Sequence, residues 1–312
     1  MAIQQPMALI NKTKKIRILI AGYPGIGKST LALSAPNPLH IDVDRGIDRV
    51  SAIHRKPFIQ PLSYDELKED LVPDNLRDFD TLVFDTGGQL IKLIGAWAIR
   101  QAAQNGQKDG SLSLKGYGAV GREFERLMNY CYYDLNKHIV VLFHAKEEKD
   151  GDNTRLRLLV EGQTKDNVWQ PMDLGGYMEM NGSKRTIGFA NCERYYAKGT
   201  HGISGVMNLP ELKPDKPNDF LTRLFAEVNS NIATEAEQIL AEQQQYEAVM
   251  AEARDIVDAV ATPEAATDAV KQITALAHIL TSEREAKAML VNKAKTLGYV
   301  WDGKTRGYQC AG

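Results

Sequence analysis

Short apolar runs alternate with amphipathic stretches over the first two thirds of the chain. Apolar residues recur with helical spacing at YDELKEDLV, at 89–104 and at 117–136. Strand and helix patterns that alternate in this way predict an α/β fold with a mainly parallel sheet flanked by helices. The runs that have the length and composition of buried strands are IRILIA (16–21), LHIDV (39–43), PFIQPL (57–62), TLVFD (81–85) and HIVVLF (138–143).

Further along, RTIGFA (185–190) and ERYYAK (193–198) predict two more strands joined by a tight turn. The pattern then changes to two helical stretches, 232–262 and 264–297, of which the first carries seven acidic residues and one basic residue. Pro263 lies between them and favours a helix boundary there. The alternation of strands and helices therefore ends before the last quarter of the chain.

We expect three parts: a polar N-terminal arm over 1–13, an α/β domain over 14–230, and a C-terminal helical region over 231–312. The last part ends in a small aromatic and basic segment, GYVWDGKTRGYQC. Mixed aromatic and basic residues suit single-stranded nucleic acid. They equally suit a small hairpin whose rings cover the preceding helix, and we favour the hairpin.

The composition limits the compartment and the partners. The 312 residues are 43% hydrophobic and 25% charged, with a net charge of −2, so any contact with nucleic acid depends on local basic patches. Cys131, Cys192 and Cys310 are far apart in the sequence, which favours a reducing compartment and argues against a zinc site. Without a signal peptide pattern or a long apolar run, we expect a soluble, cytoplasmic protein with no membrane partner.

A glycine-rich loop, GYPGIGKS (22–29), follows the first predicted strand and precedes a predicted helix at STLALSA. Its spacing satisfies the P-loop pattern GxxxxGK[ST], in which backbone N–H groups and a helix N-terminus surround phosphates. The lysine of this pattern reaches the β- and γ-phosphates and the serine hydroxyl binds Mg²⁺, so the loop predicts ATP and Mg²⁺ as ligands. A plain glycine-rich turn is the alternative. The predicted nucleotide-binding residues are Gly22, Gly25, Gly27, Lys28, Ser29 and Thr30.

A second residue for the metal is expected at Asp85, the last residue of TLVFD. A buried strand would deliver this carboxylate beside the P-loop, where it would hold Mg²⁺ through water together with Ser29. The alternative is an ordinary aspartate at a strand end.

Two carboxylates, Asp42 and Asp44, lie in HIDVDRGID (40–48), after the P-loop helix. A carboxylate at the end of such a strand can polarise the attacking water. With the P-loop and TLVFDT, this stretch resembles the RecA-like ATPase core, whose corresponding strand ends in an acidic residue with this role, usually glutamate. The resemblance implies Asp44 as the catalytic base, with Asp42 as the second candidate. Capping of the next turn is the alternative for Asp44.

The resemblance extends to the strand that ends in His144. In RecA-like proteins a polar residue, often glutamine and in some ring helicases histidine, follows this strand and senses the γ-phosphate. The resemblance implies that His144 donates to a phosphate oxygen in one nucleotide state and releases it in the other. A histidine that caps a strand end is the alternative.

Basic residues near ERYYAKGTHG (193–202) are a further point of resemblance. In RecA-like filaments such residues reach into the nucleotide site of the neighbouring subunit and stabilise charge on the γ-phosphate. Arg194 and Lys198 are the candidates, and Lys198 is the better one because it ends the predicted strand. Ordinary bases at a strand edge are the alternative.

A glycine-rich connection, QNGQKDGSLSLKGYGAVGRE (104–123), offers a candidate contact with DNA. Its charges and its one tyrosine suit a strand bound by charge and stacking, whereas a solvated surface loop is the alternative. The residues concerned are Lys108, Lys115, Tyr117 and Arg122.

The order of P-loop, VDRG, TLVFDT, GYG and FHAKEE resembles that of compact RecA-like ATPases encoded by bacteriophages, over about residues 14–215. Those proteins are associated with single-strand annealing and recombination. The resemblance implies an ATPase in the host cytoplasm that assembles as a homo-oligomer, ring or filament, on single-stranded DNA, with a single-strand-binding protein as a candidate partner. The alternatives are a translocase or helicase motor and a nucleotide-gated DNA-binding module with little hydrolysis.

Overall fold

The computed structural model describes residues 13–151, 153–160, 168–211 and 217–311. It divides into two compact units, an α/β unit of Thr13–Asn231 and a C-terminal unit that contains Ile232–Gly312. The helix α6 (Phe220–Asp258) begins in the first unit and continues in the second. Apart from Thr13, the predicted N-terminal arm lies outside the described residues.

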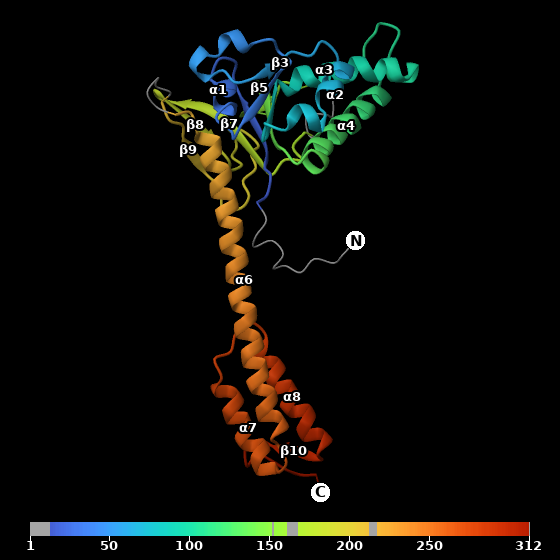
Figure 1. Cartoon of the computed structure of the whole chain (residues 1–312). Helices are drawn as coiled ribbons and strands as arrows, with labels where there is room; N and C mark the ends of the chain where they lie inside the picture. Colours follow the sequence, from blue (N-terminus) through green and yellow to red (C-terminus); the bar gives the residue numbers. More distant parts are fainter. Residues whose placement is uncertain (1–12, 152, 161–167, 212–216, 312) are drawn as a thin grey trace. The chain divides into compact units, whose positions relative to one another are not determined.

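One sheet organises the α/β unit, with strand order β3-β2-β4-β5-β1-β7-β8-β9 (Figure 1). Neighbours from β3 to β7 run parallel, β8 and β9 continue the sheet antiparallel, and β6 pairs antiparallel with β5. The predicted α/β fold with a mainly parallel sheet is confirmed. The strands are β1 (Arg17–Gly22), β2 (Pro38–Asp42), β3 (Phe58–Ile59), β4 (Thr81–Asp85), β5 (His138–Asp150), β6 (Asn153–Leu158), β7 (Leu174–Asn181), β8 (Lys184–Gly188) and β9 (Val206–Asn208).

Helices cover both faces of the sheet, which explains why the central strands are apolar along their whole length. On one face, α2 (Tyr64–Asp70), α3 (Gly87–Gln101) and α4 (Leu114–Asn129) pack together and bury their apolar residues with those of the strands (Figure 1). On the other face, the Phe225 ring at the start of α6 stacks on His138 of β5, with ring centroids 4.7 Å apart. The sheet is therefore a buried middle layer.

The helix after the P-loop, α1 (Lys28–Ala32), is shorter than STLALSA predicts. Its hydrogen bonds tighten at the end, where the N–H groups of Ser34 and Ala35 donate to the carbonyls three residues back. Ser34 also donates its hydroxyl to the Leu31 carbonyl, and it accepts a hydrogen bond from the N–H of Leu221 in α6. The chain thus leaves the helix early because this serine anchors the turn to α6.

Two of the predicted strands differ from the structure, because one is shorter than predicted and the other does not form. The predicted strand 57–62 is reduced to β3, because Pro57 and Pro61 flank it and cannot donate to a ladder. The predicted strand 193–198 does not form, and only Tyr195 and Lys198 make single bridges, to Leu156 and Gly175. Local hydrogen bonds replace the ladder there, such as the one from the Ala197 N–H to the Asn191 side chain.

The C-terminal unit consists of the rest of α6, α7 (Pro263–Ala275), α8 (Ser282–Thr296) and the hairpin of β10 (Tyr299–Asp302) with β11 (Gly307–Cys310). The predicted single helix 264–297 is therefore two helices. In the break between them, the His278 ring and the Ser282 hydroxyl bond backbone groups that would otherwise continue a helix. The predicted hairpin is confirmed.

The aromatic residues of this hairpin divide between the core and the surface. Tyr299 and Tyr308 pack against the helices, and the N–H of Tyr308 donates to the Thr267 hydroxyl of α7. Trp301 packs edge-on against Tyr308 but remains 45% exposed. Two of the three rings thus cover the helices, as expected.

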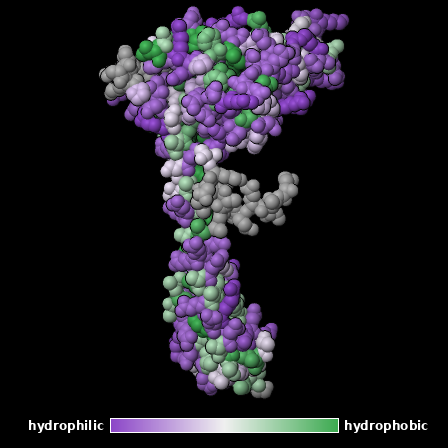
Figure 2. All heavy atoms as spheres, viewed as in Figure 1, coloured by the Kyte–Doolittle hydropathy of each residue, from purple (hydrophilic) through white to green (hydrophobic). Residues whose placement is uncertain are grey.

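Hydrophilic residues predominate on the face of the α/β unit seen in Figure 2, with hydrophobic residues scattered among them. None of the described helices combines the length and the apolar character that crossing a membrane requires.

Candidate active site

The loop between β1 and α1 has a backbone that suits glycine. Gly25 and Gly27 have φ angles of 78° and 98°, in the left-handed region where other residues are strained. Gly22 meets a different demand, because a methyl group on it would lie only 2.8 Å from the Met178 carbonyl oxygen of β7. Gly25 and Gly27 are therefore favoured by their φ angles, and Gly22 by the close approach of β7.

Lys28 is 5% exposed and its ammonium group faces back into this loop. Its Nζ donates to the carbonyls of Gly22 and Tyr23, at 3.0 and 2.9 Å, and lies 3.3 Å from His144 Nδ1. Burial lowers the pKa of Lys28 to about 8, although the charges of Asp85 and Asp44 oppose this shift. The side chain is held where a phosphate on the loop would meet it.

Asp85 ends β4 beside the P-loop, as predicted, and is 7% exposed. Burial favours the neutral acid, but hydrogen bonds from His40 and Ser29 and the charges of His40 and Lys28 hold the pKa of Asp85 below its usual value. His40, fully buried on β2, places Nε2 3.2 Å from the Asp85 Oδ2. Ser29 in α1 and Asp85 at the end of β4 supply the hydroxyl and the carboxylate that a P-loop enzyme offers to Mg²⁺, so these residues fit that ion.

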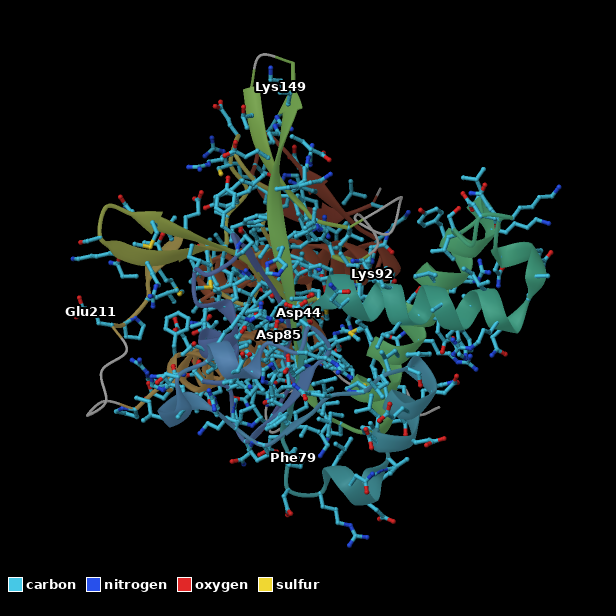
Figure 3. The ribbon with its side chains drawn as sticks, turned by 90° about the horizontal axis from the view of Figure 1, so that it is seen from above. Asp44, Phe79, Asp85, Lys92, Lys149 and Glu211 are labelled. Atoms are coloured by element: carbon cyan, nitrogen blue, oxygen red, sulfur yellow. The ribbon has the colours of Figure 1, made fainter. Side chains whose placement is uncertain are left out.

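Asp44 lies at the same edge of the sheet, just beyond the end of β2. Its N–H donates to the Asp85 carbonyl at 2.9 Å, and Figure 3 shows the two aspartates close together. Its carboxylate lies 3.1 Å from the Arg49 guanidinium. The predicted catalytic base and the predicted metal ligand are therefore neighbours.

The carboxylate of Asp42, the second candidate for the base, already accepts hydrogen bonds from its surroundings. Its side chain is fully buried and accepts hydrogen bonds from the N–H groups of Gly46 and Ile47, at 2.8 and 3.0 Å. It also accepts one from the Gln60 amide at 2.7 Å. Asp42 instead holds the turn that carries Asp44.

His144 pairs with Gly22 across the β1–β5 ladder and is half-buried. It does not end its strand, because β5 continues to Asp150 and turns into β6. Burial and the charge of Lys28 lower the pKa of His144, with Asp44 among the opposing charges. A neutral imidazole thus lies beside the lysine of the P-loop.

A cleft of about 1160 Å³ opens beside the P-loop, and Thr30 lines it together with four cationic side chains. Among these cations, Arg185 of β8 reaches the loop at Gly27, since a methyl group on that glycine would lie 3.6 Å from the Arg185 Nη1. Sequence reasoning missed Arg185, because nothing in its local pattern shows that β7 and β8 fold back to the P-loop. The cations are Arg49, Lys184, Arg185 and Arg194.

The two bases that the sequence proposed for a neighbouring subunit lie in different places. Arg194 lines this cleft and pairs with Glu179 at 3.3 Å. Lys198 lines a separate cavity, and its ammonium group donates to the Met172 carbonyl. The structure therefore does not bring Lys198 to the P-loop of its own chain.

The predicted DNA-contacting loop 104–123 is mostly helix. Helix α4 begins at Leu114, where the Ser113 hydroxyl caps it by accepting from the Gly116 N–H at 3.1 Å. Lys115, Tyr117 and Arg122 therefore lie on α4, and Lys108 alone of the four residues lies in the connection before it.

Comparisons with family models and with solved structures each found a match. The model of a family described as AAA domain matches residues 14–201. Among solved structures, the chain is similar to the flagellar accessory protein FlaH from Methanocaldococcus jannaschii, with 14% identity and a TM-score of 0.26, over 65% of this chain and 94% of that one. A search of curated protein sequences found no significant match.

The family match covers the whole candidate site, from β1 with the P-loop to the segment after β8. It also spans more than half of the 312 residues. The chain therefore belongs to the AAA domain family, and its P-loop lies within the matched residues.

Proposed function

We propose that this protein is an ATPase that assembles on single-stranded DNA and promotes annealing or strand exchange, in a bacteriophage setting. The observation that carries the ATPase part is the buried Lys28 of the P-loop, whose Nζ lies 3.3 Å from His144 Nδ1, together with the buried Asp85 at the end of β4. The DNA part is supported by the resemblance of the motif order to phage-encoded RecA-like ATPases.

The residues of the site have distinct tasks in this proposal. Lys28 binds the β- and γ-phosphates once its ammonium group exchanges the loop carbonyls for phosphate oxygens. Ser29 and Asp85 hold Mg²⁺, which when bound neutralises charge on the phosphates. Arg185 adds a second cation over the loop.

Asp44 orients and deprotonates the water that attacks the γ-phosphate. Its ion pair with Arg49 holds the carboxylate at the edge of the sheet. His144 supplies a neutral imidazole that can donate to the γ-phosphate, because burial and the charge of Lys28 lower its pKa.

Assembly as a homo-oligomer, ring or filament, completes the proposal. Lys198 remains the candidate for a contact with the nucleotide site of a neighbouring subunit, because it lies away from the P-loop of its own chain. A single-strand-binding protein is the proposed additional partner.

The test is the ATPase rate with no DNA, with a single-stranded oligonucleotide and with the duplex of the same sequence, accompanied by light scattering. We expect Mg²⁺-dependent turnover that the single strand raises and that Lys28→Ala removes, with a larger particle mass when DNA and ATP are present. Turnover that ignores DNA would contradict the DNA part alone. Tight ATP binding without turnover would favour a nucleotide-gated module, and unwinding of the duplex would favour a motor.

A further inference from the structure

A second cavity of the α/β unit, of about 470 Å³, has aromatic walls and a basic rim. Trp169, Tyr177 and Tyr196 supply the rings, and Leu156 and Leu158 of β6 supply aliphatic contact. The rim carries Arg157, Gln170 and Lys198. Of these lining residues, the function proposed above uses Lys198 alone.

The aromatic wall is fixed by the surrounding backbone. The Trp169 ring packs against Gly175 of β7, where a methyl group would come within 2.3 Å of it. Tyr177 stacks behind this ring, with centroids 6.4 Å apart, and Tyr196 meets it edge-on at 5.0 Å. Trp169 is 9% exposed and Tyr196 is 46% exposed, so Tyr196 is the ring that a ligand meets first.

The basic rim determines which class of ligand the cavity favours. Lys198 is oriented by the Met172 carbonyl, and its backbone pairs with Gly175 beneath Trp169. Arg157 neighbours the two leucines of β6 and adds a second cation. Aromatic rings beside cations suit a planar ring that carries an anionic group, with the Gln170 amide able to donate to or accept from its edge.

We propose that this cavity binds one nucleobase together with its phosphate, as a unit of single-stranded nucleic acid. Base stacking on aromatic side chains combined with charge on the backbone is the general mode of single-strand binding. A base within a duplex is already stacked and paired, so it would have to be extruded first. The single strand as the source of this unit rests on the function proposed above, whereas the nucleotide chemistry of the cavity does not.

The cavity is also connected to the P-loop through the β5–β6 hairpin, which carries Lys149 near its tip (Figure 3). The N–H of Leu159, directly after β6, donates to the His144 carbonyl at 2.7 Å. On the neighbouring β5 positions, Glu147 accepts from the Tyr23 hydroxyl of the P-loop at 2.6 Å. The hairpin that forms one wall of the cavity is therefore tied to the phosphate site.

The test uses the full chain and two probes, a fluorescent oligothymidylate and free dTMP, with binding followed by anisotropy and calorimetry. Tyr196→Ala should weaken binding of the oligonucleotide by roughly fivefold or more, the loss of one stacked base. Tyr196→Trp should restore it, because a ring is present again. Tyr133→Ala, an equally simple truncation of a 68% exposed tyrosine outside the cavity, should change nothing. A 4-thiothymidine oligonucleotide should photocrosslink to the peptide that contains Trp169 or Tyr196.

The outcomes separate this inference from the proposed function. Binding of the oligonucleotide that is unaffected by Tyr196→Ala, with crosslinks elsewhere, would overturn the cavity as the site and leave the DNA function standing. Binding of dTMP but not of the oligonucleotide would keep the nucleotide chemistry and reject the strand as its source. Binding of neither probe, in a protein that still hydrolyses ATP, would overturn the inference and the DNA part together.

Discussion

The ammonium group of Lys28 is buried among polar neighbours, and this environment has a consequence for nucleotide binding. Removal of the charge in Lys28→Ala should lower ATP affinity or turnover by at least about tenfold, roughly 1.4 kcal/mol, while the fold remains cooperative. The measurement is ATP binding by calorimetry beside a thermal melt. Lys271→Ala, which removes an exposed lysine of α7, is the matched control and should leave both unchanged.

The lowered pKa of Lys28 predicts a pH dependence of ATP affinity. The free protein holds this lysine protonated below a pKa of about 8 and neutral above it, and phosphate binds the protonated form. Affinity should therefore be constant below pH 7 and fall by about tenfold between pH 7 and 9, as the competent fraction declines. Calorimetry in two buffers of different ionisation enthalpy should also reveal proton uptake on binding at pH 9. Equal affinity at the two pH values would contradict the prediction.

Asp44 is expected to act on the reaction and not on binding. Asp44→Asn keeps the size of the side chain and removes its basicity, so ATP affinity should be kept while hydrolysis slows by about 100-fold or more. Single-turnover kinetics and equilibrium binding measure the two quantities separately. Asp48→Asn, an exposed aspartate in the next turn, should hydrolyse at the wild-type rate. Normal hydrolysis by Asp44→Asn would assign the base role to another group.

Among the structural elements, two glycines should change the stability of the protein in opposite directions when each is replaced by alanine. Gly27 starts α1 in the left-handed region, so Gly27→Ala should destabilise the protein by about 1 kcal/mol or more. Gly118 lies inside α4, where a methyl group would meet only the end of the flexible Arg122 side chain at 3.4 Å. Gly118→Ala should therefore stabilise by up to about 1 kcal/mol, as expected for a helix interior.

Denaturant unfolding of the two variants, monitored by circular dichroism, checks this pair. Stability changes of the same sign would contradict the assignment of the two backbone conformations.

At the level of the whole protein, assembly determines whether a basic residue acts between subunits. If Lys198 reaches a neighbour's nucleotide site, ATPase activity should rise faster than linearly with protein concentration, and Lys198→Ala should abolish that rise. Mixing Lys198→Ala with Lys28→Ala subunits should then recover activity, because one intact site forms where the two variants meet. Light scattering of the mixture establishes that the variants assemble together.

Two results would contradict this role. One is a mixture that assembles but stays inactive. The other is a Lys198→Ala variant that keeps the steep concentration dependence, which would leave Lys198 with the cavity that it lines in its own chain.

Local sequence patterns determined a large part of this protein. The GxxxxGK[ST] spacing and the apolar runs depend on backbone conformation and on short periodicities, which neighbouring residues express without help from distant ones. They located the P-loop, the parallel strands β1, β2, β4 and β5, and Asp85 at the end of β4. The same patterns overestimated ERYYAK, because β-propensity does not say whether a partner strand is within reach.

Only the tertiary structure decided which distant groups meet. Arg185 reaches Gly27 because β7 pairs with β1 and then folds back through β8, a consequence of strand order that neither segment encodes alone. Asp42 and Asp44 are two residues apart and chemically identical. Gln60 and the turn donate hydrogen bonds to the carboxylate of Asp42, whereas Asp44 lies beside Asp85. The burial that lowers the pKa of Lys28 likewise comes from the folded surroundings. The sequence determines which side-chain groups are present, whereas contacts across the sheet determine the environment of each group.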